Sequence, residues 1–146
     1  MTTVAEILKT KPEGAVHTIG PEATVFEAVS LMAQKNIGAL LVVENGQVVG
    51  IVSERDYARK VALMARSSRE TPLRDIMSSP VMYVQPHQTS DECMALMTEN
   101  RLRHLPVMAQ GKLVGLVSIG DLVKNIISEQ KFIIEQLEHY IAGQHA

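Results

Sequence analysis

Two Ser-x-x-Asp sequences carry the residues best suited to chemistry, Ser53 with Asp56 and Ser118 with Asp121. At the start of a helix this pattern is a capping box, in which two side chains satisfy free backbone N–H groups. The same carboxylate can accept hydrogen bonds from the vicinal hydroxyls of a sugar, as acidic residues do in dinucleotide-binding folds. The residues by themselves leave both roles open.

The two sequences belong to an internal duplication. Positions 16–56 align with positions 81–121 without a gap, at an offset of 65 residues, and 14 of the 41 aligned pairs are identical. Such a repeat predicts two similar supersecondary units, each too small to bury much surface alone. We therefore expect two copies that pack sheet to sheet, share a core and are related by an approximate two-fold axis.

Each copy predicts a strand and a helix first. The strand is expected at about 15–19 and again at 81–84, ahead of a proline. Thr24 and Thr89 then have the position and type of helix N-caps. Apolar residues follow at helical spacing, and in the second copy Cys93 takes one of these places, which favours a small core residue over a nucleophile.

A hairpin and a second helix complete each copy. Asn45-Gly46 separates two apolar runs and predicts a tight turn, because both residues tolerate positive φ, and Gln110-Gly111 takes the same place in the second copy. The second helices are expected to begin near Glu54 and near Ile119. The predicted fold class is α+β, a sandwich of two β-α-β-β-α repeats with an extended C-terminal helix.

Sequence order divides the chain into four segments. We expect a first repeat with an N-terminal helix at 1–65, a linker at 66–72, a second repeat at 73–129 and a C-terminal extension at 130–146.

The extension continues a long predicted helix. Neither Gly nor Pro interrupts residues 121–141, and Gly143 is expected to end the helix. Its apolar positions follow a seven-residue pattern. The stripe consists of Val123, Ile127, Gln130, Ile134, Leu137 and Ile141. We expect this stripe to join subunits in a homo-oligomer, a dimer of repeat pairs; the alternative is a helix that lies across its own domain.

Composition bounds the remaining possibilities. Among 146 residues, 46% are hydrophobic and 21% charged, with a net charge of −2, which fits a globular protein and disfavours nucleic acid as a partner. Apolar runs such as 39–43 are too short to span a membrane. One cysteine and no metal-ligand spacing among the histidines argue against a metal site. A cytoplasmic location without membrane association is the expectation.

The repeat resembles the CBS domain, and the tandem arrangement resembles a Bateman module. The signature residues are VVGIVSERD (48–56), LVGLVSIGD (113–121), NIGALLVV (36–43), RHLPV (103–107), and the units VAEIL (4–8) and LRDIM (73–77). The resemblance covers almost the whole chain.

This resemblance implies a regulatory role. CBS pairs place AMP, ADP, ATP, NAD or S-adenosylmethionine in clefts between the repeats, and binding often changes the behaviour of another protein. We therefore expect a non-enzymatic sensor of an adenine nucleotide (AMP, ADP, ATP or NAD) that acts on an unknown regulated protein. One alternative is a ligand-independent dimerisation scaffold. An enzyme such as a nucleotide hydrolase is disfavoured, because no nucleophile, base and metal set converges in the sequence.

The resemblance also implies roles for individual residues. The ribose is expected at Ser53, Asp56, Ser118 and Asp121. Adenine needs a flat apolar slot with backbone polar groups, expected at Thr18, Ile37, Gly38, Ala39, Tyr83 and Leu102. Phosphates need positive charge, expected from Arg55, Arg59, Lys60, Arg101, Arg103 and His104. Ordinary packing and solvated surface charge are the alternatives for these two groups.

The copies differ at several of these positions. Arg55 corresponds to Gly120, and His104 corresponds to Ala39. We therefore expect the two clefts to differ in affinity, with one of them able to remain empty.

Overall fold

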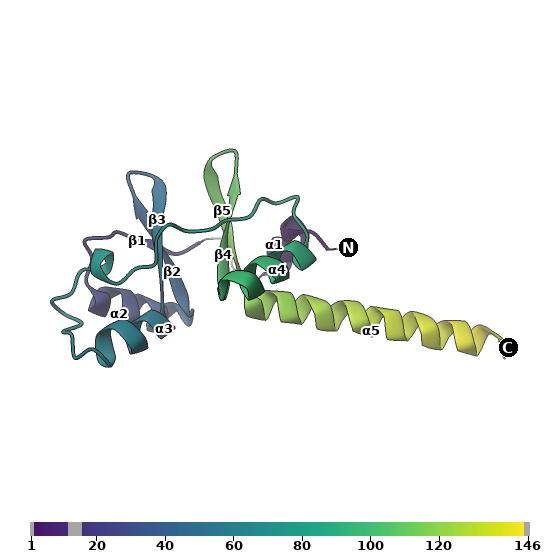
Figure 1. The fold of residues 1–146 in the computed structure, drawn as a ribbon. Helices are drawn as coiled ribbons and strands as arrows, with labels where there is room; N and C mark the ends of the chain where they lie inside the picture. Colours follow the sequence, from purple (N-terminus) through teal and green to yellow (C-terminus); the bar gives the residue numbers. More distant parts are fainter. Residues whose placement is uncertain (1, 12–15, 145–146) are drawn as a thin grey trace.

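The computed structural model describes residues 2–11 and 16–144, and it has the predicted α+β architecture with two similar halves and a long terminal helix (Figure 1). The first half contains α1 (Val4–Thr10), β1 (Thr18–Ile19), α2 (Val25–Lys35), β2 (Ala39–Glu44), β3 (Gln47–Ser53), α3 (Glu54–Asp56) and the π-helix η1 (Tyr57–Ala62). The second contains the 3-10 helix η2 (Leu73–Asp75), α4 (Ser90–Asn100), β4 (His104–Ala109), β5 (Lys112–Ser118) and α5 (Ile119–Gln144).

The two hairpins form as predicted. Strand β2 pairs antiparallel with β3, and β4 pairs antiparallel with β5. Asn45 and Gly46 have φ values of 53° and 77°, and Gln110 and Gly111 have 51° and 77°. Positive φ at both central residues matches the right-handed twist of the strands, which is why this turn joins them so closely.

The leading strands are shorter than predicted. In the first half, Thr18–Ile19 pairs parallel with β2, and Ala15 lies outside the described residues. At the corresponding place in the second half, the chain forms a single bridge between Val84 and Val107, so the prediction of a strand at 81–84 was wrong. Extending this ladder toward Met82 needs an N–H from Pro106, and proline has none.

The α-helices that precede the hairpins begin at their predicted caps. Thr24 forms a complete capping box with Glu27, and the Thr89 side chain accepts from the Glu92 N–H. Both helices end on a left-handed residue, Asn36 and Arg101. The chain therefore turns sharply at the start of each following strand, where two of the candidate binding segments lie.

Buried side chains form two clusters instead of one shared core, and each cluster includes a segment distant in sequence. Val4 and Ile7 of α1 pack with the second half, beside Cys93, which is buried as predicted. Leu73 and Ile76 pack with the first half. Backbone hydrogen bonds fix this exchange, because the Val4 N–H donates to the Gln88 carbonyl at 2.8 Å and the Leu73 N–H to the Ala23 carbonyl at 2.9 Å. Each hairpin is thus covered by a helical turn from outside its own repeat.

Helix α5 projects from the body along most of its length (Figure 1). Leu122 near its start is buried, whereas the stripe residues Ile134, Leu137 and Ile141 are 53%, 56% and 54% exposed. The alternative of a helix lying across its own domain is therefore not what the structure shows. Gly143 does not end the helix, because α5 continues to Gln144. None of the described helices is long and apolar enough to cross a membrane.

Candidate functional site

A cavity of about 590 Å³ lies between the two halves. One wall is the segment Ile37, Gly38 and Ala39 from the start of β2, and the opposite wall holds Ser118 and Asp121. The duplication therefore combines the candidate adenine residues of one repeat with the candidate ribose residues of the other.

Ser118 and Asp121 are held by the junction of β5 and α5. The Asp121 N–H donates to Ser118 Oγ at 3.1 Å, and the Ser118 N–H donates to Asp121 Oδ2 at 2.8 Å. This is the reciprocal capping box that the spacing predicts. A carboxylate offers about four lone-pair directions, so capping through one oxygen leaves Asp121 able to accept further hydrogen bonds.

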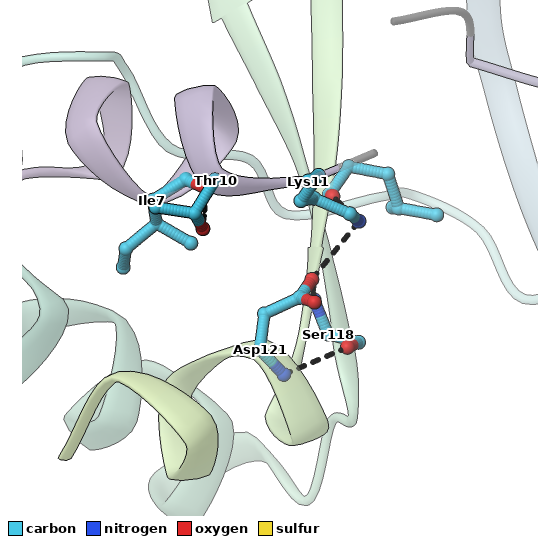
Figure 2. Close-up of polar contacts among 6 residues, drawn as sticks. Ile7, Thr10, Lys11, Ser118 and Asp121 are labelled. Carbon is cyan, nitrogen blue, oxygen red and sulfur yellow. Dashed lines mark hydrogen bonds and ion pairs between the residues drawn. The ribbon is translucent and has the colours of Figure 1, made fainter. Parts of the chain in front are cut away.

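Lys11 also contacts Asp121, a contact that the sequence reasoning missed (Figure 2). Its Nζ lies 2.9 Å from Asp121 Oδ2 and donates to the Leu116 carbonyl at 2.7 Å. Lys11 follows the last turn of α1, which packs on the second half against β5. A Cβ placed on Gly115 would lie 2.7 Å from the Leu8 side chain, so Gly115 permits this close approach.

The opposite wall exposes backbone. The Gly38 carbonyl accepts from the Glu54 N–H at 3.0 Å, and a Cβ at Gly38 would meet only Glu54 Oε1, at 3.8 Å. Gly38 is exposed, whereas the neighbouring Ala39 is buried. A flat ring can therefore approach the backbone at this point without steric hindrance from a large side chain.

Charge in the cavity is set by burial and by Lys11. Burial opposes ionisation of Asp121, but the Ser118 N–H and the Lys11 ammonium together hold the pKa of this carboxyl below its usual value. Burial and the nearby Lys11 lower the pKa of His104, which also lines the cavity. At neutral pH Asp121 is therefore ionised and His104 is uncharged.

The other Ser-x-x-Asp sequence forms a second set of polar groups at the start of α3. The Ser53 N–H donates to Asp56 Oδ2 at 2.9 Å, which completes a capping box there as well. Lys60 lies 3.4 Å from Asp56 Oδ1 and donates to the Ile76 carbonyl at 2.9 Å. Neither member of this Ser-x-x-Asp pair lines the 590 Å³ cavity.

Three arginines from both halves lie near one another beside this second set. The like charge of Arg59, then slight desolvation and the like charge of Arg103, lower the pKa of Arg55, which is an exposed residue. The first half supplies Arg55 and Arg59, and Arg103 comes from the start of β4. Such a cluster is suited to an anion.

Several candidate residues lie outside the cavity lining. Thr18, Tyr83 and Arg101 are exposed, and Leu102 packs against the core of the second half. The lining residues that the sequence reasoning missed are Leu8, Lys11, Val16, His17, Lys35, Asn36, Val114, Gly115 and Leu116. The similarity of VAEIL (4–8) to LRDIM (73–77) could have indicated part of this lining, because it predicts a helical segment beside each hairpin. The order of the sequence, however, led to the assignment of 4–8 to the first repeat, whereas α1 packs with the second half.

The described residues, 2–11 and 16–144, contain no group of three His, Cys, Asp or Glu side chains arranged to hold a metal ion.

Two similar α+β repeats in tandem with a cavity between them define a class of paired domains, and comparison with known proteins identifies it. The model of the CBS domain matches residues 4–63 and 73–128, so the chain belongs to the CBS-domain family.

Relatives cover nearly the whole chain. The mitochondrial CBS domain-containing protein CBSX3 of Arabidopsis thaliana is 38% identical over 150 residues, which cover 97% of this chain and 73% of that protein. CBS domain-containing protein YhcV of Bacillus subtilis is 35% identical over 130 residues, 89% of each chain.

Solved structures share the fold. A CBS-domain protein from Burkholderia ambifaria is 57% identical, with a TM-score of 0.85 over 88% of this chain and 96% of that one. The CBS domain pair of protein MJ0100, solved with 5′-methylthioadenosine and S-adenosyl-L-methionine, has a TM-score of 0.76 over 88% of this chain and 98% of that one. Its identity of 24% makes the likeness one of fold alone.

Proposed function

We propose that this chain is a regulatory module that binds an adenine nucleotide (AMP, ADP, ATP or NAD) between its two repeats and transmits occupancy to a partner protein. The observation that carries the proposal is the 590 Å³ cavity, which is lined both by Asp121 and by the exposed Gly38. A carboxylate, a hydroxyl and an apolar slot with backbone polar groups are the three features that an adenosine needs.

The cavity suggests a place for each part of the ligand. Asp121 and Ser118 bind the ribose hydroxyls, and the base lies against Ile37, Gly38 and Ala39. His104 lies beside the ribose site and can hydrogen-bond an oxygen of the ligand. Because the repeats are related by pseudo-symmetry, Ser53 and Asp56 form a second ribose site.

In this proposal the second site has its own phosphate-binding residues. Arg55 and Arg103 approach each other from the two repeats and bind phosphate, with Arg59 and Lys60 contributing charge. Leu102 and Tyr83 border the second base slot, and Arg101 adds charge at its edge. Thr18 has the corresponding place at the first slot. These assignments explain why the two clefts should differ in affinity.

We propose no reaction for the chain itself. Its one cysteine, Cys93, is buried, and burial raises the pKa of the thiol, so it stays protonated and unreactive. The proposed output is a change in a regulated protein.

Subunit contact through α5 is the second part of the proposal. The exposed stripe on α5 includes Ile127, Ile134 and Leu137, each more than half exposed. An apolar surface of this extent is unusual on a monomer. A dimer of repeat pairs would bury it.

A ligand-independent scaffold is the alternative function. The complete capping boxes favour this alternative, because they give a structural role in the ligand-free protein to both pairs, Ser53–Asp56 and Ser118–Asp121. Under this alternative, the fold only holds α5 in place for a partner.

A thermal-shift panel distinguishes the two functions. A ligand that binds only the folded protein stabilises it by about 2.7 kcal/mol at a hundredfold excess over Kd. We expect at least one of AMP, ADP, ATP and NAD to raise the unfolding temperature of ligand-free protein. If none of the four does so, the scaffold is the better account.

A further inference from the structure

Lys11 occupies the polar end of the cavity. Its ammonium group contacts Asp121 Oδ2 at 2.9 Å and the Leu116 carbonyl at 2.7 Å, and the lysine side chain is 29% exposed (Figure 2). An ammonium carries three N–H donors, so one remains for a bound molecule. Lys11 is therefore placed to contact any ligand that reaches Asp121.

The corresponding carbonyl in the other repeat has a different partner. Leu116 aligns with Ile51, whose carbonyl accepts from the Ser78 backbone N–H at 2.9 Å. From VAEIL to Val16 the chain has four more residues than from LRDIM to Val81, so Lys11 has no counterpart with the same spacing. A side-chain ammonium can change partners by rotating, whereas a backbone bridge cannot. Of these two aligned carbonyls, that of Leu116 is therefore the one whose donor a ligand can redirect.

Among the described residues, 2–11 and 16–144, the charged side chains that line the cavity have an excess of positive charge. They are the lysines Lys11 and Lys35 and the carboxylate of Asp121. The nearby His104 adds no charge at neutral pH, because burial and Lys11 lower its pKa. A ligand with a negative group offsets this excess, a neutral ligand leaves it in place, and a cationic ligand adds to it.

We propose that Lys11 is a specificity-determining residue that makes the Asp121 cavity select anionic adenosine ligands, nucleoside phosphates, over neutral adenosine and cationic S-adenosylmethionine. The proposal rests on the proposed function, since it presumes that an adenosine binds here. When the ribose hydroxyls donate to Asp121, the Lys11 ammonium keeps its bond to Leu116 and turns toward the phosphate. The residue is thus a counter-ion of Asp121 in the empty cavity and of the ligand in the filled one.

The test is calorimetric titration of ligand-free protein with AMP, adenosine and S-adenosylmethionine. Charge-assisted hydrogen bonds predict that the wild-type protein binds AMP about tenfold to a hundredfold more tightly than adenosine. Lys11→Met keeps the length of the side chain and removes its charge, so AMP and adenosine should then bind about equally. Lys11→Arg should restore most of the preference.

Lys9→Met is the matched control. It removes the same charge from the same helix, α1, but Lys9 is exposed and does not line the cavity. The preference for AMP should survive this change. Melting temperatures of the ligand-free variants show whether each is folded.

The outcomes separate this inference from the proposed function. If the wild-type protein binds AMP but Lys11→Met keeps the full preference over adenosine, the role of Lys11 is wrong and nucleotide binding stands. If the wild-type protein binds adenosine or S-adenosylmethionine as tightly as AMP, the inference fails without any variant. If it binds none of these ligands, nor ADP, ATP or NAD, the proposed function itself fails.

Discussion

Asp121 caps a helix in the structure, and in the proposed function it also binds the ribose. Its Oδ2 accepts from the Ser118 N–H and contacts Lys11, which closes the start of α5 and links it to the end of α1. Capping and ribose binding are therefore compatible roles, since the carboxylate has unused lone pairs. The geometry is therefore consistent with either role that the sequence leaves open, or with both together.

His104 provides a pH-dependent prediction at the residue scale. Its pKa in the folded protein lies below the ordinary value of about 6.5, because of burial and the positive charge of Lys11. The charge of Arg103 lowers this pKa further, and the carboxylates of Asp121 and Asp56 act in the opposite direction. At pH values just below about 6.5, the unfolded chain therefore binds more protons than the folded protein. The free energy of unfolding should fall as the pH drops through about 6.5, and His104→Gln should reduce this slope.

Urea unfolding between pH 5 and 7.5, as a rough range around that pKa, measures the slope. His87→Gln is the control, because His87 is an exposed histidine outside the cavity lining. Equal slopes in the wild-type protein and His104→Gln would show that His104 titrates normally in the folded state.

The elements show which parts of the fold local sequence determines. Capping boxes and the Asn45-Gly46 turn were predictable, because each depends on residues within a few positions of one another. The missing strand before α4 was also readable in principle, since Pro106 lacks the N–H that the ladder needs. Packing of α1 on the second half was not predictable from periodicity, because it depends on tertiary contacts of Val4 and Ile7 with that half. The Lys11 contact was missed for the same reason.

At the scale of the element, α5 carries a prediction about assembly. Burying Ile134 and Leu137 against a second subunit contributes on the order of 1.5–3 kcal/mol per side chain, and two-fold pairing repeats each contact. Changing both residues to lysine should therefore lower the oligomer mass measured by light scattering. Ligand binding should persist, because both Ser-x-x-Asp sequences are intact.

The matched control adds the same charge on the opposite face of α5. The control combines Gln136→Lys with His139→Lys. These two positions are one turn apart on the polar side of α5, away from the heptad stripe. This pair should leave the mass unchanged. An unchanged mass in the Ile134 and Leu137 variant would mean that assembly depends on other surfaces.

At the scale of the whole molecule, the exchange of short helical segments makes the two repeats interdependent. Lys11 follows α1, and the α1 residue Ile7 lies in the core of the second half, while Leu73 is buried in the core of the first. The cavity in turn needs Gly38 from one repeat and Asp121 from the other. A ligand bound there contacts both halves, and it does so at the N-terminal end of α5, the element proposed to join subunits.

The most direct test of this account is titration of ligand-free protein with AMP, ADP, ATP and NAD, repeated with Asp121→Asn. The account predicts that at least one nucleotide binds the wild-type protein. Asp121→Asn should weaken it by about 1.5–3 kcal/mol, the range for hydrogen bonds to charged groups. Stability without ligand should change less, because the amide oxygen of asparagine can still accept from the Ser118 N–H. Unchanged affinity with lost stability would contradict the account and leave Asp121 as a helix cap alone.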